Sequence, residues 1–212
     1  MQAQHPLAVV TPTLDGDVLT ILALVEAPFT TGQLNRLLPD RSHEGIRKVL
    51  QRLVAQGVVD AERVGYASNY RLNREHLAAE PIIALANQRR TLLQRIEENI
   101  KAWAIHPVYG AVFGSTMRGD MRTNSDVDIF LVRPDDGDTA LWEDQTHKLA
   151  ILVTRWTGND ARVLDMNEAE VRAGANDPVF ATIADQRAGT VFGGPDWLRA
   201  IVRGKARSHA DE

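Results

Sequence analysis

Residues 114–131, with the sequence GSTMRGDMRTNSDVDIFL, restrict the possible folds of this 212-residue chain more than any other stretch. An apolar run, Val108–Phe113, comes directly before them, and the pair Gly114-Ser115 ends that run. A polar loop of ten residues then leads to Asp126, and Asp128 lies at the edge of a second apolar run. This pattern predicts two strands joined by a polar loop, with both carboxylates where the second strand begins.

The spacing of Asp126 and Asp128 points to a metal site. Side chains at positions i and i+2 of a strand project from the same face, about 7 Å apart along the strand. Two carboxylates without a basic neighbour in sequence repel each other, and a divalent cation relieves that repulsion. Oxygen ligands that leave part of the coordination shell to phosphates suit Mg²⁺, so we expect a magnesium site at these residues.

The same residues resemble a known family motif. An apolar strand, Gly-Ser, a ten-residue loop and Asp-x-Asp are similar to the nucleotidyltransferase fold of the DNA polymerase β superfamily, in its minimal nucleotidyltransferase form. The resemblance implies an α/β nucleotidyltransferase fold with a small mixed sheet. It also implies that Gly114 and Ser115 hold the triphosphate of an NTP and that Asp126 and Asp128 hold two Mg²⁺ ions. The alternative is a hairpin whose loop is acidic by coincidence.

The resemblance also requires a third carboxylate on a later strand. Residues 138–157 have the apolar spacing of a helix, and Ala161–Met166 has the pattern of a short strand. Asp165, near the end of that strand, is the candidate for the third catalytic metal ligand and for the base that deprotonates the attacking hydroxyl. Its alternative role is a cap of a helix around residues 168–172. In the loop, Arg118 either pairs with triphosphate oxygens or is a solvated arginine.

The first half of the chain has a different layout. Helical patterns at residues 16–26, 32–38 and 43–56 precede a hairpin pattern that ends at Leu72. Three helices followed by a hairpin resemble a winged helix-turn-helix domain of the bacterial repressor kind, over residues 14–75. The third helix would be its recognition helix and the hairpin its wing.

Positive charge in this region suggests a nucleic-acid interface. Residues 31–74 contain eight basic and four acidic residues. Side chains at the start of a recognition helix and in a wing can reach base edges or phosphates. The candidates are therefore Arg41, Ser42, Arg47, Lys48 and Arg63. The alternative is a winged helix that serves protein contacts or dimerisation, because a fold does not determine a function.

The patterns predict four segments: a winged helix at 14–75, a connector helix at 81–105, the nucleotidyltransferase domain at 106–203 and a disordered tail at 204–212. The chain contains no cysteine, which excludes disulfides and thiolate zinc sites. It shows neither a signal-peptide pattern nor an apolar run of roughly 18 residues, so we expect a cytoplasmic protein without membrane contact.

Together these features predict a Mg²⁺-dependent enzyme that moves a nucleoside monophosphate from an NTP to an acceptor hydroxyl and releases pyrophosphate. The acceptor, whether protein, transfer RNA or small molecule, stays open, as does the oligomeric state, a homodimer included. The alternative is a DNA-binding transcriptional regulator whose nucleotidyltransferase domain is catalytically weak and senses nucleotide. By analogy alone, the resemblance also suggests a toxin–antitoxin role.

Overall fold

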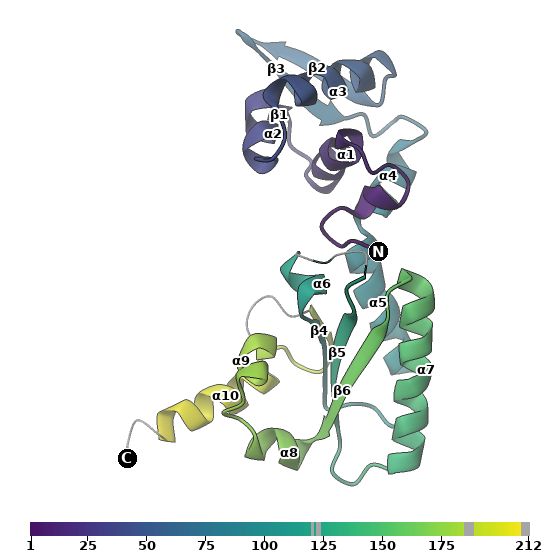
Figure 1. Ribbon diagram of the computed structural model, residues 1–212, viewed down its shortest axis with the longest axis vertical. Coiled ribbons are helices and arrows are strands. Elements are labelled where there is room, and N and C mark those ends of the chain that lie inside the picture. Colours follow the sequence, from purple (N-terminus) through teal and green to yellow (C-terminus); the bar gives the residue numbers. More distant parts are fainter. Residues whose placement is uncertain (120, 122–123, 185–188, 209–212) are drawn as a thin grey trace. The chain divides into compact units, whose positions relative to one another are not determined.

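The computed structural model describes residues 1–119, 121, 124–184 and 189–208, with side chains up to residue 204 (Figure 1). The chain forms two compact units. The first unit consists of Gln4–Gln88 together with Gln2, and the second of Arg89–Glu212 together with Met1 and Ala3. Each unit has its own apolar core, and each is described by itself.

The first unit has the element order of a winged helix. Its elements are η1 (Pro6–Val9), α1 (Leu14–Leu24), β1 (Phe29–Thr30), α2 (Thr31–Leu37), α3 (His43–Ala55), β2 (Val59–Val64), β3 (Ala67–Leu72) and α4 (Ala79–Ala86). The three strands form an antiparallel sheet in the order β1-β3-β2. The expected helices and hairpin are thereby confirmed, and the short strand β1 is added to them.

Local signals explain where these helices begin. The Thr30 side chain accepts a hydrogen bond from the Gln33 backbone, and the Gln33 side chain accepts one from the Thr30 backbone, so both groups cap α2. Ser42 caps α3 with its side chain alone, because its hydroxyl accepts from the Gly45 backbone N–H at 3.1 Å. The apolar face of α3 is buried in the core of the unit, through Ile46, Val49, Leu50 and Leu53.

The second unit contains a mixed four-stranded sheet. Its elements are α5 (Gln88–Lys101), β4 (Tyr109–Phe113), α6 (Ser115–Arg118), β5 (Val127–Arg133), α7 (Thr139–Thr157), β6 (Ala161–Asn167), α8 (Glu168–Ala173), α9 (Pro178–Ala184), β7 (Gly189–Phe192) and α10 (Trp197–Ser208). The strand order is β6-β5-β4-β7. Strand β6 runs parallel to β5, whereas β4 is antiparallel to both β5 and β7. This is the small mixed sheet that was expected.

Helices cover both faces of this sheet (Figure 1). On one face, α5 and α7 pack against Val127, Ile129 and Leu131. On the other face, α8, α9 and α10 pack against Phe130 and Val132. Alternate residues of β5 therefore enter two different cores, which is why this strand is almost continuously apolar. The polar exception on the second face is Asp128.

Two predicted elements differ in the structure. The connector expected as one helix over 81–105 is two helices, because α4 ends at its cap residue Asn87 and α5 begins at Gln88. The Asn87 side chain donates to the Ile83 carbonyl at 2.8 Å and so satisfies a carbonyl at the helix end. The tail expected to be disordered is helical as far as Ser208, and residues 209–212 lie outside the described part. In the part of the chain that the structure describes, no helix has the length and apolarity needed to span a membrane.

Candidate functional site

The glycine–serine turn joins β4 to the short helix α6. Gly114 has φ 68° and ψ −148°, a conformation that is open essentially only to glycine. A side chain at this position would also overlap the carboxylate of Asp128, whose Cγ lies 3.2 Å from the place of a Cβ. Glycine therefore serves two purposes here, since it permits the turn and leaves room for the carboxylate. Ser115 is the first residue of α6, so its backbone N–H has no acceptor within the helix.

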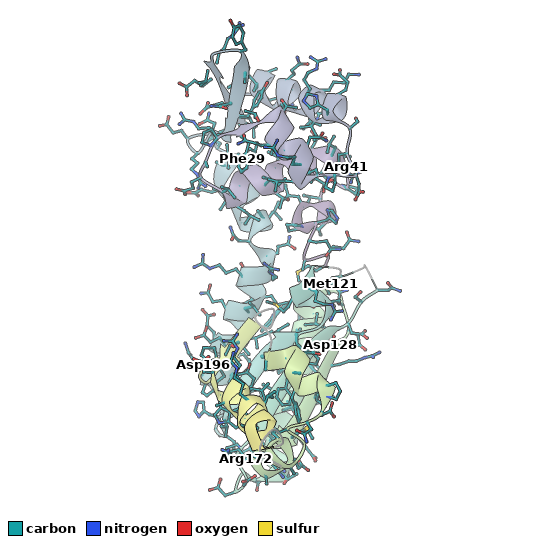
Figure 2. The ribbon with its side chains drawn as sticks, turned by 90° about the vertical axis from the view of Figure 1, so that its left-hand side faces the viewer. Phe29, Arg41, Met121, Asp128, Arg172 and Asp196 are labelled. Carbon is teal, nitrogen blue, oxygen red and sulfur yellow. The ribbon has the colours of Figure 1, made fainter. Side chains whose placement is uncertain are left out.

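The two aspartates flank the first residue of β5. Asp126 directly precedes the strand, and Asp128 pairs in register with Phe113, the last residue of β4 (Figure 2 labels Asp128). Burial raises the pKa of the Asp128 carboxyl above its ordinary value, and the negative charge of Asp126 raises it further. The structure thus brings Gly114, Asp126 and Asp128 together, as expected.

Two arginines act on this pair of carboxylates. Arg162 on β6 pairs in register with Asp128, and its Nη2 lies 2.9 Å from Oδ2 of Asp126. The positive charges of Arg162 and Arg118 lower the pKa of Asp128 and partly offset the effect of burial. Arg118 is exposed at the end of α6, close enough for its charge to act on Asp128. The sequence analysis missed Arg162, because its place beside Asp128 depends on how β6 pairs with β5.

Asp165 does not join the pair. In the parallel register it lies beside Leu131, three residues further along β5 than Asp128 and on the opposite face of the sheet. Its Oδ2 accepts a hydrogen bond of 2.5 Å from Nε1 of Trp142, on the face covered by α5 and α7. The structure therefore corrects the expectation that Asp165 is the third carboxylate, because alternation along β6 turns its side chain away from Asp128.

The two remaining carboxylates suit a hard divalent cation. Their donor atoms are oxygens, and burial together with the negative charge of Asp126 raises the pKa of Asp128. Among the described residues, no group of three or more His, Cys, Asp or Glu side chains could hold a metal ion. A cation at Asp126 and Asp128 would therefore complete its shell with water or phosphate oxygens.

Two buried residues that the sequence analysis did not single out position this loop. Met121 is fully buried in the core on the α5–α7 face, and the Thr116 hydroxyl donates to its sulfur (Figure 2 labels Met121). The Asn159 amide donates to the carbonyl of Ser125 at 2.8 Å, directly before Asp126. Nothing in the sequence showed that Asn159, just after α7, would hold the other end of the loop.

Residues 91–158 match the family model described as "Nucleotidyltransferase domain". The match includes the Gly114-Ser115 turn and both Asp126 and Asp128, and it ends before β6 begins. The nucleotidyltransferase class expected from the motif is thereby confirmed.

Several solved structures are similar to the chain at low identity. A toxin–antitoxin crystal structure with AMP-PNP is 18% identical, with a TM-score of 0.40, over 56% of this chain and 87% of that one. The tri-AMPylated Shewanella oneidensis HEPN toxin in complex with MNT antitoxin is 14% identical, with a TM-score of 0.38, over 58% and 87%. TrmBL2, an archaeal chromatin protein, is 14% identical with a TM-score of 0.30, over 88% of this chain and 79% of its own. The comparison with curated proteins found no match.

Outside the nucleotidyltransferase domain, the basic residues of the first unit are largely paired. Arg41 donates to Oδ2 of Asp17 from Nε and Nη2, at 3.1 and 2.8 Å (Figure 2 labels Arg41). Arg47 donates to both oxygens of Glu44, at 2.8 and 2.6 Å, and this contact lowers the pKa of the Glu44 carboxyl. The predicted nucleic-acid residues Lys48 and Arg63 are exposed. Within the described part of the chain neither of these two forms an ion pair.

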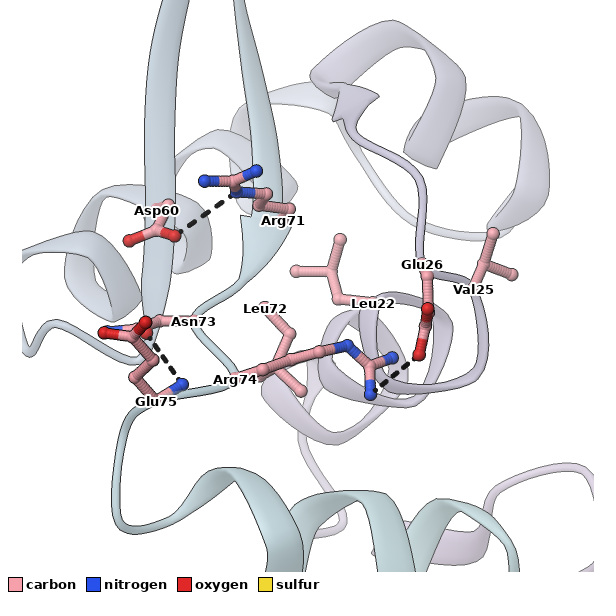
Figure 3. A pocket seen from close by; sticks show the side chains of 9 residues that line it. All are labelled: Leu22, Val25, Glu26, Asp60, Arg71, Leu72, Asn73, Arg74 and Glu75. Carbon is pink, nitrogen blue, oxygen red and sulfur yellow. Dashed lines mark hydrogen bonds and ion pairs between the residues drawn. The ribbon is translucent and has the colours of Figure 1, made fainter.

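The first unit also contains a pocket of about 450 Å³, near the ends of α1, β2 and β3 (Figure 3). Arg71 lies 3.3 Å from Asp60, and Arg74 lies 3.2 Å from Glu26. Carboxylates outnumber guanidinium groups along its wall, because Glu75 adds a third acidic side chain. This charge balance does not favour a phosphate ligand.

Proposed function

We propose that the protein transfers a nucleoside monophosphate from an NTP to an acceptor hydroxyl in a Mg²⁺-dependent reaction. The observation that carries this proposal is the contact between the Gly114 turn and the Asp128 carboxylate, with Asp126 beside it, inside a nucleotidyltransferase domain. The close approach of backbone and carboxylate puts a candidate phosphate-binding turn and a candidate metal ligand at one point.

Each residue has a distinct part in this proposal. Asp126 and Asp128 would hold Mg²⁺. When bound, this ion would neutralise negative charge on the phosphate oxygens. Gly114 and Ser115 would hold the triphosphate through the backbone N–H and the serine hydroxyl, with Arg118 close enough to add a positive charge. The acceptor oxygen forms a bond to the α-phosphorus, the α–β phosphoanhydride bond breaks, and pyrophosphate leaves.

The proton of the acceptor hydroxyl passes to solvent in this proposal. Asp165 would have been the base, but it lies on the other face of the sheet and bonds to Trp142. Phosphoryl transfer depends mainly on positioning and electrostatic stabilisation, and in this proposal the ion held by Asp126 and Asp128 would supply the electrostatic part. A second Mg²⁺ stays a prediction. The third carboxylate that was expected to hold one of the two ions, Asp165, does not lie beside Asp126 and Asp128.

The test is label transfer from the four NTPs, each labelled at the α-phosphate, to the macromolecules and small molecules of a cell lysate. We expect one NTP to label an acceptor in the presence of Mg²⁺ and pyrophosphate to appear in equal amount. The double substitution Asp126→Asn and Asp128→Asn is the matched control, because it removes both charges and keeps the side-chain size. Labelling by this variant at the rate of the unchanged protein would contradict the proposal.

A second candidate function concerns the first unit. One observation favours nucleic-acid binding: the solvent side of α3 carries the exposed Arg47, Lys48 and Gln51, while its other side is buried. Such a helix can enter a major groove, and the β2–β3 hairpin with Arg63 would contact the backbone as a wing. A gel-shift titration at two salt concentrations tests this, because phosphate contacts weaken steeply as salt rises. Absence of any shift at low salt would leave a scaffold or dimerisation role.

A further inference from the structure

Arg162 is a positively charged residue in direct contact with the carboxylate pair. It lies on β6 in register with Asp128, and residues paired in this way lie about 4.8 Å apart on the same face of a sheet. Its guanidinium contacts Asp126, two residues before Asp128, with 2.9 Å between Nη2 and Oδ2. The arginine side chain is 69% exposed, compared with 28% for Asp126. A solvent-accessible cation is therefore paired with one of the two candidate metal ligands.

The contact is poorly explained as a device for stability. Exposed ion pairs contribute little to folding, since solvent screens them and the side chains lose freedom. The β5–β6 pairing is already held by seven residue pairs in register and by buried side chains such as Ile129. What the contact does change is the charge at the site: together with Arg118, it offsets the repulsion between Asp126 and Asp128.

We infer that Arg162 is a displaceable counter-cation, which pairs with Asp126 when no metal is bound and has to leave before Mg²⁺ can bind Asp126 and Asp128 together. The inference rests on the proposed function. A divalent cation and the Arg162 guanidinium would both bind the Asp126 carboxylate, and two positive charges in contact with one carboxylate repel each other. Metal affinity is therefore the result of an exchange between the two cations.

The test is a titration of the full-length, nucleotide-free protein with Mn²⁺, in which electron paramagnetic resonance measures the concentration of free Mn²⁺ at each step. We expect Arg162→Gln to bind Mn²⁺ about two- to fivefold more tightly than the unchanged protein, the range that corresponds to loss of an exposed ion pair. Arg162→Lys keeps the charge and should bind close to the unchanged affinity. The matched control is Arg133→Gln, which removes the same charge at the far end of β5.

The outcomes separate this inference from the proposed function. If Arg162→Gln binds Mn²⁺ no more tightly than Arg133→Gln while the unchanged protein binds it, Arg162 does not compete with metal and the proposed function stands. If Arg162→Lys gains affinity as much as Arg162→Gln does, charge is not the cause and the inference also fails. If Asp126→Asn/Asp128→Asn binds Mn²⁺ as tightly as the unchanged protein, the metal lies elsewhere, which overturns both.

Discussion

Replacement of Gly114 by alanine tests the central geometric feature of the site. The backbone conformation at this residue, φ 68° and ψ −148°, is sparsely open to any residue with a Cβ. The added methyl group would also overlap the Asp128 carboxylate and lie 3.5 Å from its Cβ. Alanine therefore has two effects, which are backbone strain and displacement of a candidate metal ligand.

A second glycine, at which only backbone strain is expected, separates the cost of strain from the effect of displacing Asp128. A residue held in a sparsely populated backbone region costs about 1–3 kcal/mol. Gly158, which ends α7, has a left-handed conformation with φ 70°, and nothing lies within 4 Å of the place of its Cβ. Gly158→Ala should thus cost about 1–2 kcal/mol from strain alone. Gly114→Ala adds the displacement of Asp128, so we expect loss of Mn²⁺ binding in that variant only.

Tryptophan fluorescence measures the stability of the relevant unit directly. The chain has four tryptophans, and all of them lie in the second unit: Trp103, Trp142, Trp156 and Trp197. For a unit of this size, each kcal/mol shifts the midpoint of thermal unfolding by roughly 4 °C. We expect a lower midpoint for both glycine variants, beside unchanged Mn²⁺ affinity in Gly158→Ala. Unchanged Mn²⁺ affinity in a folded Gly114→Ala protein would refute the argument that this turn and Asp128 share one space.

Three further variants test other residues. Burial raises the pKa of Asp128, so ionisation of this carboxyl destabilises the folded state as pH rises through the folded pKa. Asp128→Asn should therefore raise the midpoint of thermal unfolding at neutral pH, and this gain should vanish in acid. Fluorescence-monitored thermal unfolding at several pH values measures both. Ser115→Ala should weaken NTP binding about fivefold, the effect of one lost hydrogen bond of about 1 kcal/mol, and equal affinities by calorimetry would remove the serine from the site. If the first unit binds DNA, replacing Arg47 and Lys48 by glutamine should reduce the salt slope of binding by about two, measured by gel shift, whereas equal slopes would exclude both from phosphate contact.

The strand–turn–strand part of the site could be predicted because its signals are local. The spacing of two residues placed Asp126 and Asp128 together where the second strand begins, and the Gly114-Ser115 pair marked the turn, without any knowledge of distant contacts. The face of Asp165 could not be predicted in this way. It depends on the register between β5 and β6, which is set after a 19-residue helix, and a shift by one residue would turn every side chain of β6 to the other face.

In both units, formal charges counted along the sequence do not show which charged groups are free to bind a ligand. Counted along the sequence, residues 31–74 have an excess of positive charge, but the fold pairs Arg41 with Asp17 and Arg47 with Glu44. A phosphate that contacts Arg47 therefore has to compete with a carboxylate that is already bound to it. In the second unit the roles are reversed, because Arg162 occupies the Asp126 carboxylate that a metal ion would need. In each case the partner, rather than the count of charges, determines how strongly a ligand can bind. The Arg47–Glu44 and Arg162–Asp126 pairs are partly exposed, and solvent weakens such pairs, so a ligand can displace either of them at low cost in free energy.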